Sequence, residues 1–249
     1  MTKIAEMPQP RGKLGLTHPV PPAEGDYRWV YLWHWPIRAM HWIAALAIVV
    51  LVITGFYIGQ PYFMTGGEEV SRFTMGWMRF FHFASAAVLI ATGIVRTYWL
   101  IAGNRYERFP ALFPVRRRDW VNLFRMTKYY LMIKPDQAPH YLGHHPLQQL
   151  TYTGVYVVTI IMVTTGFAMY GLSNPGGLFS TMFGWVAPLV GGHQMVRFIH
   201  HALTWFYLIF IPLHVYLALR ADNLERTGTI SSIVSGGRFV PEEEDFVDA

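Results

Sequence analysis

Four long apolar stretches, separated by polar or glycine- and proline-rich segments, dominate the chain. They run approximately from Pro36 to Gly59, Met75 to Ala102, Leu150 to Gly171 and Val196 to Leu219. A helix that crosses a bilayer needs about 20 mainly apolar residues, and each stretch reaches that length. The pattern therefore predicts an all-α membrane protein, a bundle of four transmembrane helices.

The segments between and beyond the spans predict the remaining organisation. Residues 118–133, "RDWVNLFRMTKYYLMI", have the apolar spacing of a helix that lies on the membrane surface. Residues 174–192 are apolar but interrupted by Gly and Pro, so we expect a re-entrant or interfacial loop and not a fifth span. Residues 1–27 are polar and Pro-rich, without the apolar core of a cleaved signal peptide. We expect them to be a disordered tail before a membrane domain at 28–220. Residues 221–249 are expected to form a second tail with a solvated acidic end.

Charge orients this arrangement and excludes other classes of protein. Only 14% of the 249 residues are charged, against about a quarter in soluble domains. The segment 103–146 holds eight Lys and Arg residues, whereas 172–194 holds none. By the positive-inside rule the basic loop and both termini are cytoplasmic, so the basic residues indicate topology and not nucleic-acid binding. The absence of cysteine excludes disulfides, thiolate metal sites and covalent haem attachment.

Four histidines within the spans are the main candidates for chemistry, because an ionisable side chain inside a membrane is costly. His200 and His214 are fourteen residues apart on the last span. This spacing returns a helix to nearly the same face after a rise of about 21 Å. One imidazole therefore lies in each leaflet. Depth pairs His82 with His200 on the outer side and His41 with His214 on the inner side. Two stacked b-type haems, each held by two histidines, would use all four.

Arginine and glycine add to this hypothesis. Arg38, Arg79 and Arg197 each precede a candidate ligand by three residues, and positions i and i+3 share a helix face. Each guanidinium could pair with a haem propionate, although arginines near span ends also snorkel to headgroups. Gly55 and Gly166 are places where a flat macrocycle can approach the backbone, or where helices simply pack closely.

The chain also repeats itself weakly. "VITGFYIG" in the first span corresponds to "VTTGFAMYG" in the third, and "RFFHFA" in the second to "RFIHHA" in the fourth. The repeat makes His82 equivalent to His200, and Arg96 equivalent to His214, which suggests a polar site near Arg96. His201 points about 100° away from its neighbour, so we favour His200 as the ligand. His34 precedes the apolar run and is expected at the interface.

Two other classes of function fit less well. A transporter or proton channel that uses intramembrane histidines as relays should carry acidic partners, and residues 36–59 and 150–171 contain none. A passive membrane anchor would explain the spans but not the four histidines at matching depths.

Several longer motifs resemble a known family, the cytochrome b subunits of membrane-bound uptake nickel–iron hydrogenases. The matching stretches are "IRAMHWIAALAIVVLVITGFYIG", "MGWMRFFHF", "AGNRYERFPALFPV", "GHHP", "FIHHALTWFYLIFIPLHVYLALRAD" and "ISSIVSGGR". The similarity covers roughly residues 28–238. The family's R-x-x-H-W motif corresponds to Arg38, His41 and Trp42, and its H-x13-H pattern to His200 and His214. "GHHP" departs from the expected "GHNP", because His145 replaces an asparagine.

The resemblance implies an electron-transfer subunit that is not an enzyme on its own. Electrons from a periplasmic hydrogenase, made of a small and a large subunit, would reach the outer haem, cross to the inner haem and reduce a quinone near the cytoplasmic side. The implied location is the bacterial inner membrane, in assemblies of several heterotrimers. The cytochrome subunits of formate dehydrogenase and thiosulfate reductase are the alternative, differing in partner. The quinone pocket cannot be identified from the sequence; it would lie near His41, His214 and Arg96 if it adjoins the inner haem.

Overall fold

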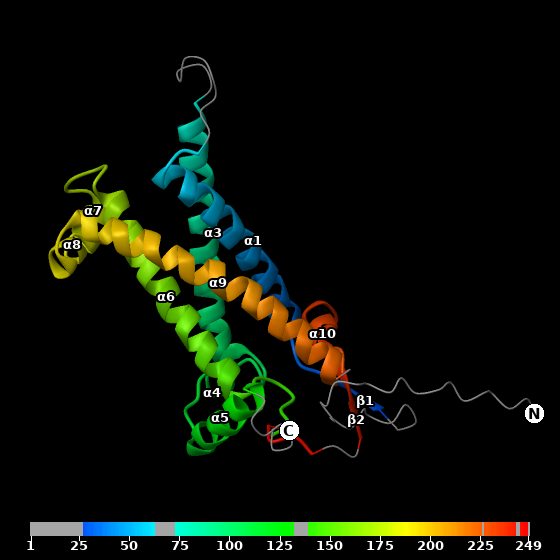
Figure 1. The fold of residues 1–249 in the computed structure, drawn as a ribbon. Coiled ribbons are helices and arrows are strands. Elements are labelled where there is room, and N and C mark those ends of the chain that lie inside the picture. The colour runs from blue at the N-terminus through cyan, green and yellow to red at the C-terminus, as the bar shows by residue number, and fades with distance from the viewer. Residues whose placement is uncertain (1–26, 63–72, 132–138, 226, 243–244, 249) are drawn as a thin grey trace, which may run out of the picture.

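Four long helices make up most of the computed structural model (Figure 1), which describes residues 27–62, 73–131, 139–225, 227–242 and 245–248. They are α1 (Trp35–Gly59), α3 (Thr74–Ala102), α6 (Pro146–Gly171) and α9 (His193–Glu225). Each is long and apolar enough to cross a membrane. The prediction of four transmembrane helices is confirmed, and the expected tail at 1–27 falls outside the described residues except for Tyr27.

The third span begins four residues earlier than expected, at Pro146, because the preceding residue caps it. The Nδ1 atom of His145 accepts a hydrogen bond from the backbone N–H of Gln148 (3.3 Å), and the Gln148 side chain accepts one from the backbone N–H of His145 (3.1 Å). This reciprocal pair satisfies two donors that a helix N-terminus otherwise leaves free. The polar residues before Leu150, which the hydropathy pattern excluded, therefore join the helix.

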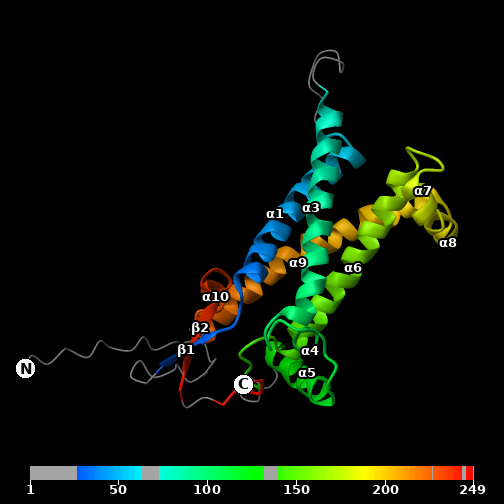
Figure 2. The same ribbon diagram turned by 180° about the vertical axis from the view of Figure 1, so that it is seen from behind.

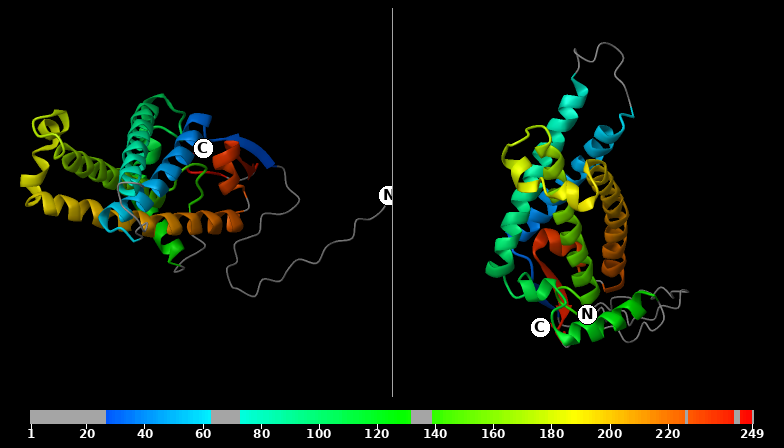
Figure 3. Two further views of the ribbon diagram at one scale, coloured as in Figure 1. Left: turned by 90° about the horizontal axis from the view of Figure 1, so that it is seen from above. Right: turned by 90° about the vertical axis from the view of Figure 1, so that its left-hand side faces the viewer.

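The long helices form two antiparallel pairs, α1 with α3 and α6 with α9 (Figure 3). The pairs contact each other only sparsely. No residue of α3 is buried within the described part of the chain, and large apolar side chains such as Phe80, Ile94 and Ile101 are exposed. Because lipid solvates apolar side chains as well as protein does, this exposure is what a membrane-spanning helix requires.

Two short helices cap one end of the bundle. They are α7 (Leu178–Phe183) and α8 (Val186–Val190), with six and five residues, too short to cross a bilayer. Both pack against α6, and α8 also packs against the start of α9. The contact centres on a small buried cluster, Ala168, Val186, Ala187 and Val196, against which Phe183 of α7 packs. The apolar segment 174–192 is therefore not a fifth span, as expected.

The opposite end carries more structure than the sequence indicated (Figure 2). It contains α4 (Phe109–Leu112), α5 (Arg117–Tyr130), α10 (Thr229–Ser235) and two strands, β1 (Tyr27–Tyr31) and β2 (Gly237–Pro241). Helix α5 forms where the amphipathic helix is expected, and its place on the membrane surface stays a prediction. The strands pair antiparallel, with Tyr27 opposite Pro241 and Tyr31 opposite Gly237. The second strand lies within residues 221–249, for which the sequence predicts only a tail.

The acidic C-terminal segment is not wholly solvated, which corrects our expectation. The carboxylate of Asp248 accepts hydrogen bonds from the backbone N–H groups of Leu142 (2.7 Å) and Gly143 (2.8 Å). Leu142 in turn packs with Leu32, Tyr106 and Val240 in a buried cluster. Both ends of the described chain are thus fastened to the loop that precedes α6.

Candidate cofactor sites between the helices

The outer candidate pair, His82 and His200, meets between the two helix pairs. His82 lies on α3 and His200 on α9, and their ring centroids are 6.5 Å apart with the ring planes inclined at 59°. The two rings make no hydrogen bond to each other in the structure. The two imidazoles therefore converge without bonding to each other.

A threonine hydroxyl holds each of these imidazoles in the same way. Thr54 Oγ1 lies 2.9 Å from His82 Nδ1, and Thr165 Oγ1 lies 2.9 Å from His200 Nδ1. Each hydroxyl also donates to a carbonyl one turn earlier in its own helix, at 2.7 Å. Since the hydroxyl hydrogen is used there, the oxygen accepts from the ring and Nδ1 carries the proton. Nε2 of each ring therefore has a free lone pair.

The glycine after each threonine makes room for the same ring. A Cβ atom built on Gly55 would lie 3.3 Å from Cε1 of His82, and one built on Gly166 would lie 3.3 Å from Cε1 of His200. The sequence leaves two roles open for these glycines, the approach of a macrocycle and close helix packing. In the structure the atoms nearest to each glycine belong to an imidazole. Each Thr-Gly dipeptide therefore packs against a histidine from the neighbouring helix, with a hydrogen bond to the threonine and space from the glycine.

The inner candidate pair, His41 and His214, has nearly the same spacing but different surroundings. The ring centroids of His41 on α1 and His214 on α9 are 6.4 Å apart, inclined at 52°. His214 stacks on Phe210 at 5.5 Å, and His41 contacts the edge of Trp42 at 5.0 Å. The Nδ1 atom of His41 is buried, with no hydrogen-bond partner among the described residues.

The spacing of both pairs fits two imidazoles that ligate one metal from opposite sides. A bond from a metal to an imidazole nitrogen is about 2.0 Å, and with about 1.1 Å from that nitrogen to the ring centre the two centroids should be roughly 6.2 Å apart. The observed 6.4 and 6.5 Å agree. No cluster of three His, Asp or Glu side chains that could hold a bare metal ion occurs in the described residues. Two imidazoles suffice for a metal that already has other ligands, as the iron of a haem does.

The three predicted propionate partners differ in their contacts. Arg38 donates from Nη1 to the carbonyl of Val234, and its Nε is buried without a partner in the described part of the chain. Arg79 and Arg197, near the outer pair, are exposed. Neither makes a hydrogen bond or ion pair with another described residue. All three therefore retain guanidinium donors for an external carboxylate, and this role stays a prediction.

His201 does not join the outer pair. Its ring lies on the end of α1, with Nδ1 3.4 Å from a Cβ atom built on Gly59 and its centroid 5.3 Å from that of Phe56. Only His200 of the two adjacent histidines faces His82.

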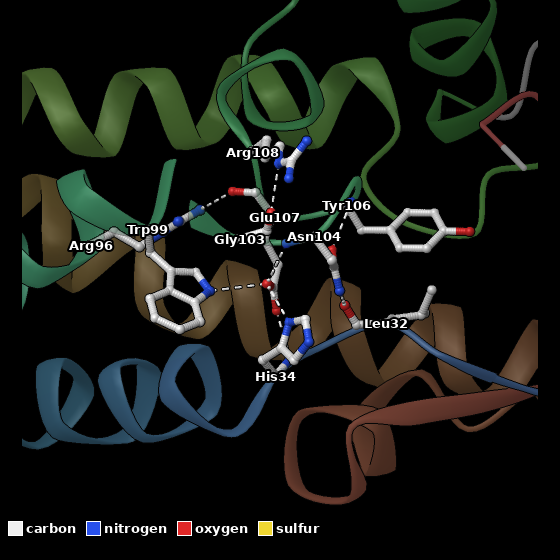
Figure 4. Close-up of polar contacts among 9 residues, drawn as sticks. All are labelled: Leu32, His34, Arg96, Trp99, Gly103, Asn104, Tyr106, Glu107 and Arg108. Carbon is white, nitrogen blue, oxygen red and sulfur yellow. Dashed lines mark hydrogen bonds and ion pairs between the residues drawn. The ribbon is translucent and has the colours of Figure 1, made fainter. Parts of the chain in front are cut away.

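A buried carboxylate near the inner pair was not found from the sequence. The side chain of Glu107 follows α3 and is fully buried. It accepts hydrogen bonds from the backbone N–H and ring of His34 (2.6 and 2.8 Å), the indole of Trp99 (3.0 Å) and the backbone N–H of Asn104 (3.1 Å), as Figure 4 shows. Burial raises the pKa of Glu107, but the hydrogen bonds from His34, Asn104 and Trp99 outweigh it and bring the pKa below its usual value. His34 is the N-cap of α1, so Glu107 fastens the start of α1 to the end of α3.

Arg96 lies beside this carboxylate and is the polar feature that the repeat suggested. It donates to Tyr156 Oη (3.2 Å) and to the carbonyl of Glu107 (3.2 Å). Its remaining Nη1 is buried without a partner in the described residues. Burial, and then the charge of Arg96, lower the pKa of the nearby His144 to about 4. Burial and the adjacent His144 lower the pKa of His145 to about 3. Both histidines are therefore neutral at physiological pH.

Comparison with known proteins supplies an independent finding. The family model described as prokaryotic cytochrome b561 matches residues 32–236. This range contains all four helices and both histidine pairs.

Individual relatives cover most of the chain. A protein of Azotobacter chroococcum mcd 1 named "Probable Ni/Fe-hydrogenase B-type cytochrome subunit" is 39% identical over 219 residues, which is 86% of this chain and 90% of the relative. A protein of the same name from Cupriavidus necator is 39% identical over 211 residues, 84% of this chain and 86% of the relative. The "Probable Ni/Fe-hydrogenase 1 B-type cytochrome subunit" of Escherichia coli K12 is 32% identical over 213 residues, 84% of this chain and 90% of the relative.

Proposed function

The chain belongs to the prokaryotic cytochrome b561 family, and from this premise we propose that it is the B-type cytochrome subunit of a nickel–iron hydrogenase in the bacterial inner membrane. It carries electrons from the hydrogenase through two haem b groups to a quinone. The names of its relatives support the hydrogenase partner. The observation that supports the two-haem path is the presence of two imidazole pairs with nearly equal spacing, one toward each end of α9.

The residues of the chain would hold and tune the two groups. His82 and His200 would ligate the outer haem through Nε2, because Thr54 and Thr165 occupy both Nδ1 atoms. His41 and His214 would ligate the inner haem. A hydrogen bond to the second nitrogen of a ligating imidazole fixes its tautomer and makes it a stronger ligand, so the threonines are positioning residues. Bound haem b supplies a reversible one-electron couple at each depth.

The arginines complete both sites at the membrane surfaces. Arg79 and Arg197 are exposed near the outer pair. Three residues before His41, Arg38 has a buried Nε without a partner among the described residues. A buried guanidinium donor without a partner costs free energy unless a ligand satisfies it. A propionate carboxylate at Arg38 would remove this cost at the inner site.

The orientation of the chain in the membrane assigns an expected partner to each histidine pair. Eight basic residues between 103 and 146 place the α4–α5 end in the cytoplasm by the positive-inside rule. The outer pair then faces the periplasm, where the hydrogenase small subunit would deliver electrons. The inner pair lies near the cytoplasmic face, where a quinone would take up two electrons and two protons to form a quinol. The cytochrome has no catalytic group of its own in this scheme, and the complete complex would contain several heterotrimers.

Haem content and its dependence on single histidines test the proposal. The purified subunit should bind two b-type haems per chain. His200→Ala and His214→Ala should each lose one, with different potentials in the remaining haem. His201→Ala is the matched control, since this neighbour of His200 faces α1, and it should keep both. A folded wild-type chain with one haem or none would refute the two-haem path.

Partner and acceptor need a separate measurement. In membranes that contain the assembled complex, dihydrogen should reduce the haems, and an added quinone should reoxidise them. If formate reduces the haems and dihydrogen does not, the chain belongs to the alternative formate dehydrogenase type of complex.

A further inference from the structure

A cavity of about 410 Å³ lies at the proposed cytoplasmic end, outside the histidine sites. Residues from the segment after α3, from α5, from the start of α6 and from the C-terminal segment line it. Its volume falls within the range of about 300–1,000 Å³ that is typical of small-ligand sites. It is not lined by any of the four candidate haem ligands.

The walls of the cavity carry an excess of positive charge. Arg105, Arg108, Arg116 and Arg118 line it. Arg105 donates to the phenol of Tyr106 and Arg108 to the carbonyl of Gly103, both neutral groups. Neither these two nor Arg116 lies within 4.0 Å of a carboxylate oxygen of another described residue.

The two carboxylates that line the cavity already have partners. Asp119 accepts from the backbone N–H of Arg116 (3.1 Å) and lies 3.9 Å from Arg118. Asp248 is occupied by two backbone N–H groups of the loop before α6. The four guanidinium groups and two carboxylates among the described lining residues therefore leave an excess of two positive charges around one cavity, which favours an anionic ligand.

The walls of the cavity offer hydrogen-bond donors, whereas its floor carries atoms that can accept hydrogen bonds. Gln149 is only 4% exposed, and its Nε2 donates to the carbonyl of Ala111 (3.1 Å). Its Oε1 is buried without a partner among the described residues. The same holds for Nδ1 of His144. In the neutral tautomer that carries its proton on Nε2, Nδ1 of His144 is an acceptor. Within the described residues, the floor thus offers two polar atoms without a partner, Gln149 Oε1 and His144 Nδ1.

The position of the cavity relative to the membrane favours a lipid headgroup over a soluble anion as the ligand. Trp120, Val121 and Phe124 of the adjoining α5 are 49%, 51% and 70% exposed, as expected of a helix that rests on lipid. Gln149 lies in the first turn of a membrane span. The cavity is therefore at the level of the lipid headgroups, where basic recesses bind anionic lipids.

We propose that this cavity binds the headgroup of an anionic glycerophospholipid of the phosphatidylglycerol type. The phosphate lies among Arg105, Arg108 and Arg116, and the glycerol hydroxyls donate to Gln149 Oε1 and His144 Nδ1. A phosphatidylcholine headgroup carries the same phosphate, but it has no hydroxyl to donate to the floor, and its quaternary ammonium is repelled by the guanidinium groups of the walls. The bound lipid would join α5 to the start of α6.

Lipid titrations of the purified complex in a neutral detergent test this assignment. Short-chain phosphatidylglycerol should raise the unfolding midpoint in a saturable way, and short-chain phosphatidylcholine should not. Arg116→Gln should weaken the apparent affinity about tenfold, since a charge-assisted contact at an exposed position is lost. Arg117→Gln removes the same charge from the next residue, which does not line the cavity, and should change the affinity less than twofold.

Two further probes separate the alternatives. If inorganic phosphate or glycerol 3-phosphate binds as tightly as phosphatidylglycerol, the site takes a soluble anion and the lipid assignment is wrong. If Arg117→Gln weakens binding as much as Arg116→Gln, diffuse surface charge is responsible and there is no site. Gln149→Leu should reduce the preference for phosphatidylglycerol over phosphatidic acid, which lacks the glycerol hydroxyls, and an unchanged preference would refute the role of the floor.

Discussion

Replacing Glu107 by Gln should destabilise the inner end of the bundle strongly, although it changes one atom. The carboxylate accepts four N–H donors, one at Oε1 and three at Oε2. An amide keeps the three bonds at Oε2 only by directing its own N–H₂ at the backbone N–H of His34. That bond, 2.6 Å long in the structure, is then replaced by two opposed donors.

The magnitude follows from the number and charge of these bonds. Losing a charge-assisted hydrogen bond to a buried donor costs about 1.5–3 kcal/mol, and each of the remaining three weakens by up to about 1 kcal/mol when its acceptor becomes neutral. We expect a total of about 4 kcal/mol. For a chain of this length each kcal/mol lowers the melting temperature by roughly 2–4 °C, so the shift should be about 8–16 °C.

Thermal unfolding of the purified subunit, followed by circular dichroism, measures this shift. Glu242→Gln, an exposed glutamate with the same change in charge, is the control and should shift the midpoint by less than about 2 °C. Because the pKa of Glu107 is lowered by its hydrogen bonds despite burial, its stabilisation is complete above the unfolded pKa of 4.5 and is lost as the pH falls through the folded pKa. The melting temperatures of wild type and Glu107→Gln should therefore approach each other at acidic pH. Equal shifts for both variants at neutral pH would refute this role of the carboxylate.

Three other predictions concern the outer site and the acid stability of the chain. Thr165→Val should raise the reduction potential of the proposed outer haem in a redox titration, because His200 becomes a weaker ligand. Thr165→Ser should keep the wild-type potential. Equal potentials in the Val and Ser variants would contradict the role of the hydrogen bond. Gly166→Ala should lower haem occupancy at this site, measured by absorbance, because its Cβ would lie 3.3 Å from the ring of His200. The pKa of buried His144 is lowered from 6.5 to about 4, so the neutral ring contributes its full stabilisation above pH 6.5. As the pH falls from 6.5 to 4, the free energy of unfolding should decrease by up to about 3 kcal/mol. His144→Phe should reduce that loss in pH-dependent melting curves, and an unchanged curve would assign it to other groups.

The helices and the meeting of the histidine pairs could be derived from the sequence because both depend on short-range regularities. Span length follows from bilayer thickness, and the depth of a side chain follows from its position within its span. The fourteen-residue spacing of His200 and His214 needs only the geometry of one helix. No tertiary contact has to be known to reach these conclusions.

The features that were missed depend on contacts between segments distant in the sequence. Thr54 and Thr165 stand in the repeated stretches, but their hydrogen bonds to His82 and His200 depend on how neighbouring helices are rotated. Glu107 is a lone acid in a basic loop, and nothing local indicates that four donors converge on it. A repeat that keeps a threonine–glycine dipeptide in both halves was nevertheless a usable signal.

The pairing of β1 with β2 has a consequence for the order in which the protein is made. Tyr27 pairs with Pro241, so about 210 residues must be synthesised before the first strand meets its partner. At roughly 5–20 residues per second, β1 waits for some 10–40 s while all four spans enter the membrane. The closing of this small sheet is therefore a late event. A ribosome that stops before Pro241 leaves the edge of β1 unpaired and open to proteolysis.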